Sequence, residues 1–256
     1  MSRQPLTFTA LPGIPLIRPG DDLVAILLAG LSAAGLTLAQ GDVLVIGQKI
    51  VSKAEGRYVD LKDVTPSPEA ERLSRETSKD PRLVELILRE SVEVLRKRDN
   101  LIVVEHKLGF VCANAGIDRS NVKGEGDGEW VLLLPEDPDK SARELRAGLF
   151  AASEVRIGIL INDSHGRAWR VGTVGVCIGV AGFPAIVDLR GEKDLFGYTL
   201  RSTVIGLADE IAAGASALMG QADERQPVIH VRGLPYSLRE GSLSEIIREK
   251  DLDLFR

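Results

Sequence analysis

The sequence predicts an α+β (mixed α/β) fold, and three observations support this prediction. Strand-like and helix-like patterns are interspersed along the chain, but not in a regular βαβ repeat. The chain has 256 residues, enough for one large domain with a substantial core. Apolar residues make up 44% of the chain and charged residues 27%, which is an ordinary composition for a globular protein.

The composition also excludes several classes of protein. A net charge of -5 argues against a general nucleic-acid binder, which needs a basic face. The apolar runs are far shorter than the roughly 20 residues of a membrane span, and the N-terminus lacks the apolar core of a secretion signal. Cys112 and Cys177 have no metal-ligand spacing, which predicts two buried, reduced thiols. We therefore expect a soluble cytoplasmic protein with no nucleic-acid or membrane partner.

The first elements follow from apolar patterning. Residues 41–56 begin with a turn pair and continue as a β-branched apolar run, which predicts a buried strand ending near Ser52 and Lys53. Residues 66–98 predict two helices. The second helix begins after Pro81, because apolar residues recur at helical spacing from there.

The middle of the chain predicts a helix and two long strands. Residues 139–153 form the helix, with Ser141 and Glu144 in capping-box spacing. Residues 154–163 are the clearest buried strand. Residues 173–182 alternate small and apolar residues, which suits a strand that another backbone or a ligand approaches closely. Shorter patterns predict strand, turn and strand at 100–116, a loop at 122–130 and a short strand at 131–135.

The last third predicts a long helix at 202–220, rich in small residues and stopped by Gly220. Its small residues suit tight packing in a core or a dimer seam, and its C-terminal turn could instead border a ligand. A strand is expected at 227–233 and a capped terminal helix at 242–250.

Two carboxylates are candidates for a metal site. Asp163 follows the buried strand, and strand ends are a common position for functional residues in α/β proteins. Mg²⁺ usually binds one or two carboxylates together with phosphates, so a second carboxylate is expected nearby. Asp118 in "NAGID", with Asn121 three residues later, is the best match. Each stretch taken alone also fits a polar turn.

Other polar residues allow alternative functions. Ser164 and His165 could suggest a hydrolase, but neighbouring residues diverge and the chain has no GxSxG elbow, so a capped turn fits better. Lys53 could meet a phosphate as a point charge or be a solvated lysine. The chain contains neither GxxxxGK[ST] nor a GxGxxG after a strand, so any nucleotide site lies outside the two common phosphate loops.

Several longer stretches occur in a characteristic order. They are "GIPLIRPGDDL", "GDVLVIGQKIVSKAEGR", "CANAGIDRSNV", "LLPEDPDKSARELR", "ILINDSHGRAWRVGTVGVCIGVAG", "GEKDLFGYTL", "ADEIAAGASALMG" and "HVRG". Together they resemble the coenzyme F₄₂₀-0:γ-glutamyl ligases over about residues 8 to 246. The resemblance implies a compact, ligase-specific fold of mixed sheets flanked by helices. It also implies a homodimer and a single ligase domain over 1–256, divisible into two subdomains. Some relatives carry a flavin-reductase-like C-terminal domain, and this chain resembles the form without it.

The resemblance also implies an activity. Such an enzyme adds L-glutamate to the deazaflavin precursor F₄₂₀-0 and then adds further γ-linked glutamates. It uses GTP as cosubstrate and an acyl-phosphate intermediate, with Mn²⁺ or Mg²⁺, two ions in all, and K⁺. Two alternatives stay open: an amide ligase of the same scaffold with another acceptor or nucleotide, and a non-catalytic nucleotide- or deazaflavin-binding module.

Site residues carry over by position. Lys53, Asp118 and Asp163 match catalytic positions. The implied metal ligands are Asp118, Asp163, Ser164 (where the family usually has Thr) and Gln221. The implied nucleotide contacts are Ile14, Pro15, Leu16, Ile17, Gln48, Lys49, Lys53, Asn121, Ala217, Leu218, Met219, Gly220, Gln221, Ala222, Asp223 and Glu224.

Three of these positions depart from the family pattern. Gln48 and Lys49 stand where relatives often have Ser and Thr, and Gln221 stands where some have Glu, which leaves the nucleotide preference open. No general base is identified, although His165 lies near enough to be considered. Arg167 and Arg170 offer paired donors for a phosphate or a carboxylate.

Overall fold

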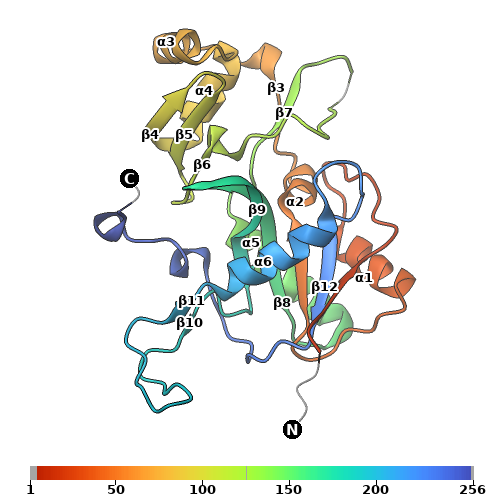
Figure 1. Cartoon of the computed structure of the whole chain (residues 1–256). Coiled ribbons are helices and arrows are strands. Elements are labelled where there is room, and N and C mark those ends of the chain that lie inside the picture. Colours follow the sequence, from red (N-terminus) through yellow and green to blue (C-terminus); the bar gives the residue numbers. More distant parts are fainter. Residues whose placement is uncertain (1–4, 125, 255–256) are drawn as a thin grey trace.

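The computed structural model describes residues 5–124 and 126–254 (Figure 1). Its centre is a five-stranded sheet in the order β1-β12-β2-β8-β9. Strands β2 and β8 are parallel, and the other neighbouring pairs are antiparallel. The predicted mixed α+β architecture is therefore confirmed. The sheet comprises β1 (Thr7–Ala10), β12 (Val228–Arg232), β2 (Val43–Gly47), β8 (Gly158–Arg167) and β9 (Arg170–Ala181).

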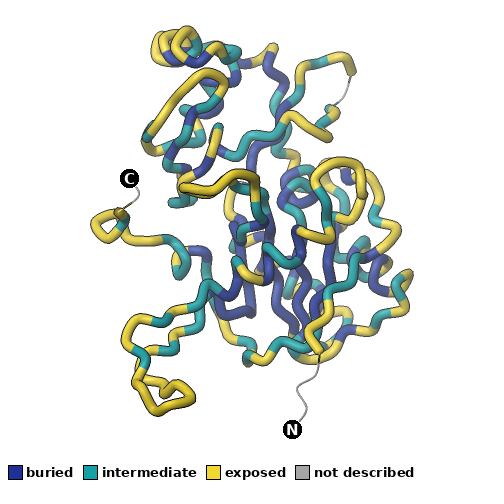
Figure 2. Tube along the Cα trace, in the orientation of Figure 1, coloured by how far each residue is buried: buried dark blue, intermediate teal, exposed yellow. Residues whose placement is uncertain are grey.

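Helices cover both faces of this sheet. Leu44 and Ile46 belong to the core cluster that includes residues of α1 and α5, whereas Val43 and Val45 pack in the cluster with α6. A strand buried on both faces has an uninterrupted apolar sequence, which is why residues 43–46 gave such a clear prediction. Figure 2 shows the sheet as the most buried part of the molecule. The covering helices are α1 (Leu23–Ala33), α5 (Pro138–Ser153) and α6 (Leu207–Met219).

A separate core cluster forms around two helices and a small sheet, at the top of Figure 1. Its residues come chiefly from α3 (Pro68–Thr77), α4 (Pro81–Arg89), β4 (Ser91–Arg98), β5 (Leu101–His106) and β6 (Val111–Ala113). The remaining elements are short. They are α2 (Gln48–Ala54), β3 (Tyr58–Asp60), β7 (Trp130–Leu132), β10 (Val187–Asp188), β11 (Val204–Ile205) and the 3₁₀ turns Leu61–Asp63, Asn114–Gly116, Leu243–Glu245 and Lys250–Leu252.

Strand β12 comes from the last part of the described chain, yet it lies between β1 and β2. A buried ion pair fixes it there. His230 of β12 has its Nε2 atom 2.8 Å from Oδ2 of Asp42, the residue just before β2, and Arg232 donates to the same carboxylate. Both His230 and Asp42 are almost completely buried. The hydrogen bonds from Arg232 and His230 lower the pKa of Asp42 despite its burial.

Two predicted elements were wrong. The strand predicted at 41–56 ends at Gly47, and α2 follows at once, so Lys53 lies in the last turn of a helix. The second helix of 66–98 ends at Arg89, because residues 91–98 form strand β4. The β-branched Val92 and Val94 favour a strand there, and the helical pattern before them concealed it.

Several boundaries also needed correction. Strand β8 continues to Arg167, so Asp163 lies inside a strand. Helix α5 is capped by Asp137 and not by Ser141, whose hydroxyl hydrogen-bonds to the Glu55 carboxylate. The long helix spans 207–219, shorter than the predicted 202–220. The terminal helix expected at 242–250 is reduced to 3₁₀ turns.

Other predictions are confirmed. Residues 100–116 form strand, turn and strand, and Gly220 ends α6. Residues 122–124 and 126–129 are irregular, and Glu125 lies outside the described residues. Cys112 and Cys177 are buried and free, and burial raises the pKa of the Cys112 thiol to about 12. Among the described helices, none has the length and apolar character needed to cross a membrane.

The glycines of β9 explain how α5 and α6 approach the sheet. A Cβ on Gly175 would lie 2.5 Å from the carbonyl oxygen of Ala212 in α6. A Cβ on Gly179 would lie 2.5 Å from Pro138 at the start of α5. The predicted close approach to this strand is therefore confirmed, and at Gly175 and Gly179 the approaching atoms belong to α6 and α5.

Candidate functional site

A cavity of about 630 Å³ lies where β2 ends and α2 begins. Strand β2 pairs with β8 up to Gly47 and Asn162, so β8 continues past the end of β2 with Asp163 and Ser164. Both residues line the cavity. Most of the remaining wall comes from four segments far apart in sequence, 14–17, 47–53, 121–123 and 219–227.

Asp118 lies beside the cavity and is held by α2. The Gln48 side-chain amide donates to Oδ2 of Asp118 at 2.6 Å, and Nζ of Lys49 lies 3.2 Å from Oδ1. Burial raises the pKa of Asp118 above its ordinary value. Lys49 opposes this increase, and the negative charge of Asp163 adds to it. The charge of Asp163 thus acts on Asp118, and Gln48 and Lys49, the two residues that depart from the family pattern, contact Asp118 directly.

Lys49 and Lys53 are four residues apart on α2 and therefore project from the same side of the helix. Lys53 donates to the backbone oxygen of Asn121 at 2.8 Å, and Asn121 in turn donates to the Ala222 oxygen at 3.0 Å. Burial lowers the pKa of Lys53, and the neighbouring charge of Lys49 lowers it further. Two ammonium groups at one cavity wall favour an anionic ligand.

Asn162 is a site residue that sequence reasoning missed. It lines the cavity and is 4% exposed, and its Oδ1 atom has no hydrogen-bond partner within the described chain. Its amide nitrogen donates only to the sulfur of Met219, at 3.5 Å. A buried polar atom without a partner carries a free-energy cost, and such atoms gather at functional sites. Its one sequence cue is its place in "IND", immediately before Asp163.

The donor set suits a hard divalent cation. Residues 5–124 and 126–254 hold no group of three or more His, Cys, Asp and Glu side chains arranged for a metal. The cavity is instead lined by Asp163 and Ser164, and the Asp118 carboxylate lies beside it, in contact with the lining residues Gln48 and Lys49. A cation such as Mg²⁺ accepts one or two carboxylates and takes its other oxygens from phosphates and water, whereas structural zinc needs four protein ligands.

His165 points to Asp163 and not to Ser164. Its Nε2 atom lies 2.9 Å from Oδ2 of Asp163, and its ring packs against Phe110 with centroids 5.1 Å apart. Phe110 stacks on the buried ring of His106. Adjacent residues of a strand face opposite sides of the sheet, so β8 separates Ser164 from His165. This geometry gives no support to a serine hydrolase.

Most of the residues expected to contact a nucleotide line this one cavity. They are Ile14, Pro15, Leu16, Ile17, Gln48, Lys49, Lys53, Asn121, Met219, Gly220, Gln221, Ala222, Asp223 and Glu224. Ala217 and Leu218 do not line it and are exposed on the outer side of α6. Besides Asn162, seven further lining residues were not expected, namely Gly47, Ile50, Val122, Lys123, Arg225, Gln226 and Pro227.

The loop after α6 is tied down by its own hydrogen bonds. Gln221 donates to the Ser216 hydroxyl at 3.3 Å, and the backbone N–H of Ala222 donates to the Glu224 carboxylate at 2.8 Å. The Gln221 amide nitrogen is therefore engaged within the protein. Its amide oxygen is the atom that a cation would need.

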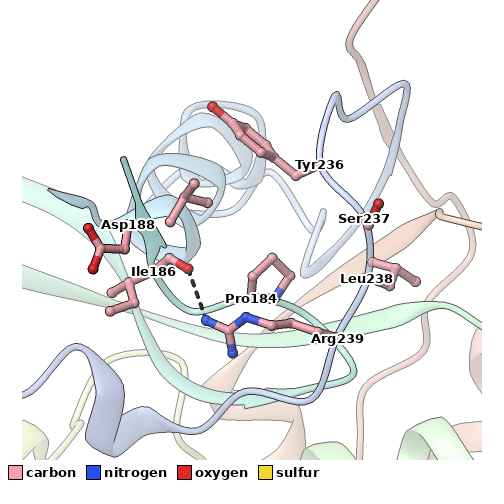
Figure 3. A pocket seen from close by; sticks show the side chains of 8 residues that line it. Pro184, Ile186, Asp188, Tyr236, Ser237, Leu238 and Arg239 are labelled. Carbon is pink, nitrogen blue, oxygen red and sulfur yellow. Dashed lines mark hydrogen bonds between the residues drawn. The ribbon is translucent and has the colours of Figure 1, made fainter. Parts of the chain in front are cut away.

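A second hollow lies on another part of the surface, between the segments 184–188 and 236–239 (Figure 3). Its lining is mainly apolar, and Arg239 donates to the Ile186 oxygen and pairs with Glu245. It contains none of the predicted site residues, so the first cavity is the candidate functional site.

Comparisons with known proteins identify the family that the chain resembles. A family model described as "F420-0:Gamma-glutamyl ligase" matches residues 13–233. The chain is 44% identical to a coenzyme F₄₂₀:L-glutamate ligase of Methanothermobacter thermautotrophicus, over 98% of the chain and 99% of that protein. It is 46% identical to the protein of the same name from Methanopyrus kandleri, over 94% of the chain and 93% of that protein. The one from Archaeoglobus fulgidus is 43% identical, over 95% and 94%.

Proposed function

Because the chain belongs to the F₄₂₀-0:γ-glutamyl ligase family and is thus an enzyme, a ligase of coenzyme F₄₂₀ biosynthesis, we propose that it adds L-glutamate to F₄₂₀-0 with GTP as cosubstrate. Further γ-linked glutamates follow on the same chain. One observation carries the proposal: Asp163, Lys49 and Lys53 line one cavity, and Asp118 lies beside it in contact with Lys49.

The proposed reaction has two chemical steps. A carboxylate does not react directly with an amine, because oxide is too poor a leaving group. The terminal carboxylate of F₄₂₀-0 therefore attacks the γ-phosphorus of GTP, and GDP leaves with the electron pair of the broken P–O bond. The glutamate amine then attacks the acyl carbon, loses a proton and expels inorganic phosphate, and an amide forms.

The residues of the cavity would act by position and charge, which is how phosphoryl transfer is mostly catalysed. Lys49 and Lys53 would neutralise phosphate oxygens as point charges. Asn121 joins α2 to the loop after α6 through Lys53 and Ala222, and so keeps the two walls of the nucleotide site together. Leu16, which is 86% exposed at the rim, would cover an apolar face of the nucleotide.

Asp118, Asp163 and Ser164 would hold the divalent cations, Mn²⁺ or Mg²⁺, with Gln221 as a further oxygen donor. When bound, these ions would supply positive charge that neutralises the phosphate groups. Burial raises the pKa of Asp118 and the charge of Asp163 adds to the increase, and a bound cation would offset both effects. K⁺ remains part of the proposal through the family resemblance.

A homodimer is the proposed assembly, and it would involve residues 188–203, the arm that leaves the body of the molecule at the lower left of Figure 1. Leu195 and Phe196 are more than 90% exposed in this arm, and Tyr198 is 56% exposed. Asp194 accepts hydrogen bonds from the backbone of Phe196 and Tyr198, which gives the tip a defined shape. Large apolar side chains gathered on an ordered arm mark a protein contact.

The reaction can be tested with the purified chain, F₄₂₀-0, L-glutamate, GTP and Mn²⁺, followed by mass spectrometry. We expect mass steps of one or more glutamyl units, at least about 100-fold slower in Asp163→Ala because a charge-neutralising group is lost. Asp99→Ala is the matched control, since Asp99 is exposed and accepts a side-chain hydrogen bond only from Asn100 within the described chain.

The other outcomes separate the alternatives. Product with a different nucleotide but not with GTP would identify the same ligase with another cosubstrate. Full activity in Asp163→Ala would exclude the proposed metal site. No product with any nucleotide would favour a binding module or another acceptor.

A further inference from the structure

The tip of the β8–β9 hairpin, residues 167–171, carries exposed apolar side chains and two arginines. The Trp169 side chain is 88% exposed and Val171 is 99% exposed. Arg167 donates only to the backbone oxygens of Gly172 and Val171. Within the described part of the chain, neither Arg167 nor Arg170 pairs with a carboxylate.

The same hairpin carries the proposed reaction centre. Side chains alternate along a strand, so Asp163 and His165 lie on one side of β8, and Arg167 ends the strand where its pairing with β9 shifts register. At about 3.3 Å per residue, Arg167 is roughly 13 Å along the strand from Asp163. The nucleotide cavity, with Lys53 and the 219–227 loop, surrounds the other end of this path. A ligand that reaches from Asp163 to the tip would therefore run away from the nucleotide.

The backbone of the tip holds the indole in an unusual conformation. Trp169 has φ of +63°, in the left-handed region that bulky residues rarely adopt. Gly172 also has positive φ and completes the reversal between β8 and β9. Such strain persists where a function or the surrounding structure requires it. The result is an indole exposed to solvent, with Arg167 and Arg170 on either side of it in the sequence.

We propose that this hairpin tip binds the acceptor of the ligase reaction, with a planar ring system stacked on Trp169 and an anionic group other than the reacting carboxylate paired with Arg167 and Arg170. This inference rests on the proposed function. It follows from charge complementarity and from continuity with the site: the acceptor is an anionic molecule with a planar ring, and it must place a carboxylate at the γ-phosphate beside Asp163. Glutamate is too short to span the path, and the nucleotide already has its own cavity.

Steady-state kinetics of Trp169→Ala and Arg170→Ala test the assignment, with F₄₂₀-0, GTP and glutamate varied in turn. We expect the KM for F₄₂₀-0 to rise about tenfold or more in each variant, since loss of stacking or of a charged partner has effects of this size. The KM values for GTP and glutamate should stay within about twofold. Trp169→Phe should recover most of the affinity, because a phenyl ring can still stack. Arg98→Ala, which removes an exposed arginine on β4, is the control.

A direct readout uses the two tryptophans of the chain. In a Trp130→Phe variant, Trp169 is the one remaining indole, and F₄₂₀-0 added without GTP should quench its emission. An unchanged KM for F₄₂₀-0 in both variants, an increase in the KM for GTP instead, or an absent quench would overturn the proposal. If the wild-type chain forms no product at all, the proposed function fails, and the quench alone then decides whether the tip binds F₄₂₀-0.

Discussion

Asp118 forms an ion pair with Lys49 within the protein itself. Gln48 and Lys49 each contact one of its carboxylate oxygens. A divalent cation at Asp118 must therefore compete with the Lys49 ammonium, which is free to turn toward phosphate once it is displaced. Lys49 also donates to Ser120 at 3.1 Å, so it already has a second partner near the cavity.

His106 should make the stability of the fold depend on pH. Burial lowers its pKa from 6.5 to about 4, so the folded protein keeps this ring neutral. Between those two pH values the unfolded chain binds a proton that the folded chain does not. The ring's contribution to stability is therefore complete above pH 6.5 and is lost as the pH falls toward 4. We expect a loss of about 2–3 kcal/mol across this range from His106 alone.

His106→Asn should flatten this part of the profile, as measured by denaturant unfolding at several pH values. The Asn oxygen can accept the hydrogen bond that the Leu108 N–H now donates to the ring, so the turn is kept. Other groups titrate in both proteins and cancel in the difference. Parallel profiles for the two proteins would show that His106 is not protonated on unfolding.

Single residues differed in how far the sequence predicted them. Asp118 and Asp163 were expected to lie near each other, and the charge of Asp163 does act on the pKa of Asp118, whereas their joint role as metal ligands stays a prediction. Lys53 was expected at the cavity and lines it, but it reaches it from a helix. Asn162 was missed, because an unpartnered side-chain oxygen is a property of packing that one sequence does not display.

At the scale of elements, the sequence predicted long periodic segments well and short ones poorly. The α2 helix has seven residues, fewer than two full turns of a helix need to show a period. Its apolar residues therefore merged with those of β2 into one predicted strand. The opposite error occurred at β4, whose alternation over 91–94 follows a strongly amphipathic helix after a single residue.

The contact between β9 and α6 should be intolerant of any added side chain. In Gly175→Ala the new Cβ would meet the Ala212 carbonyl oxygen and the Ser216 Cβ, both at 2.5 Å, so α6 must shift. We expect a loss of about 1–3 kcal/mol in unfolding free energy, as for other overpacked cores. Nucleotide affinity should also fall, because the last turn of α6 leads into the loop that lines the cavity.

Gly166→Ala in the same hairpin is the control. Its φ is not positive and nothing lies within 4 Å of the added Cβ, so its stability should change by no more than about 0.5 kcal/mol. Thermal unfolding and nucleotide titration of the two variants check both points. Equal stability of the two would mean that α6 can move away from β9 without cost.

At the scale of the whole molecule, the arm should determine the oligomeric state. We expect wild-type protein at twice the chain mass of 27.6 kDa in light scattering, and a monomer for Phe196→Asp, because a charge would enter an apolar contact. Val92→Asp, an exposed apolar residue on β4, should leave the dimer unchanged. A dimer that survives Phe196→Asp would place the contact elsewhere, and a monomeric wild-type protein would exclude the assembly.

The place of β12 between β1 and β2 also governs the order in which the chain can fold on the ribosome. While residues 228–232 are still unsynthesised, β1 has no partner and one edge of β2 is open. The central sheet therefore cannot be completed until β12 has emerged from the ribosome. Until then an apolar strand edge is exposed to other growing chains. The Asp42 carboxylate also has no hydrogen bonds from His230 and Arg232 until those residues have been synthesised. Translation rate and chaperone access should accordingly limit the yield of this protein more strongly than its final stability does.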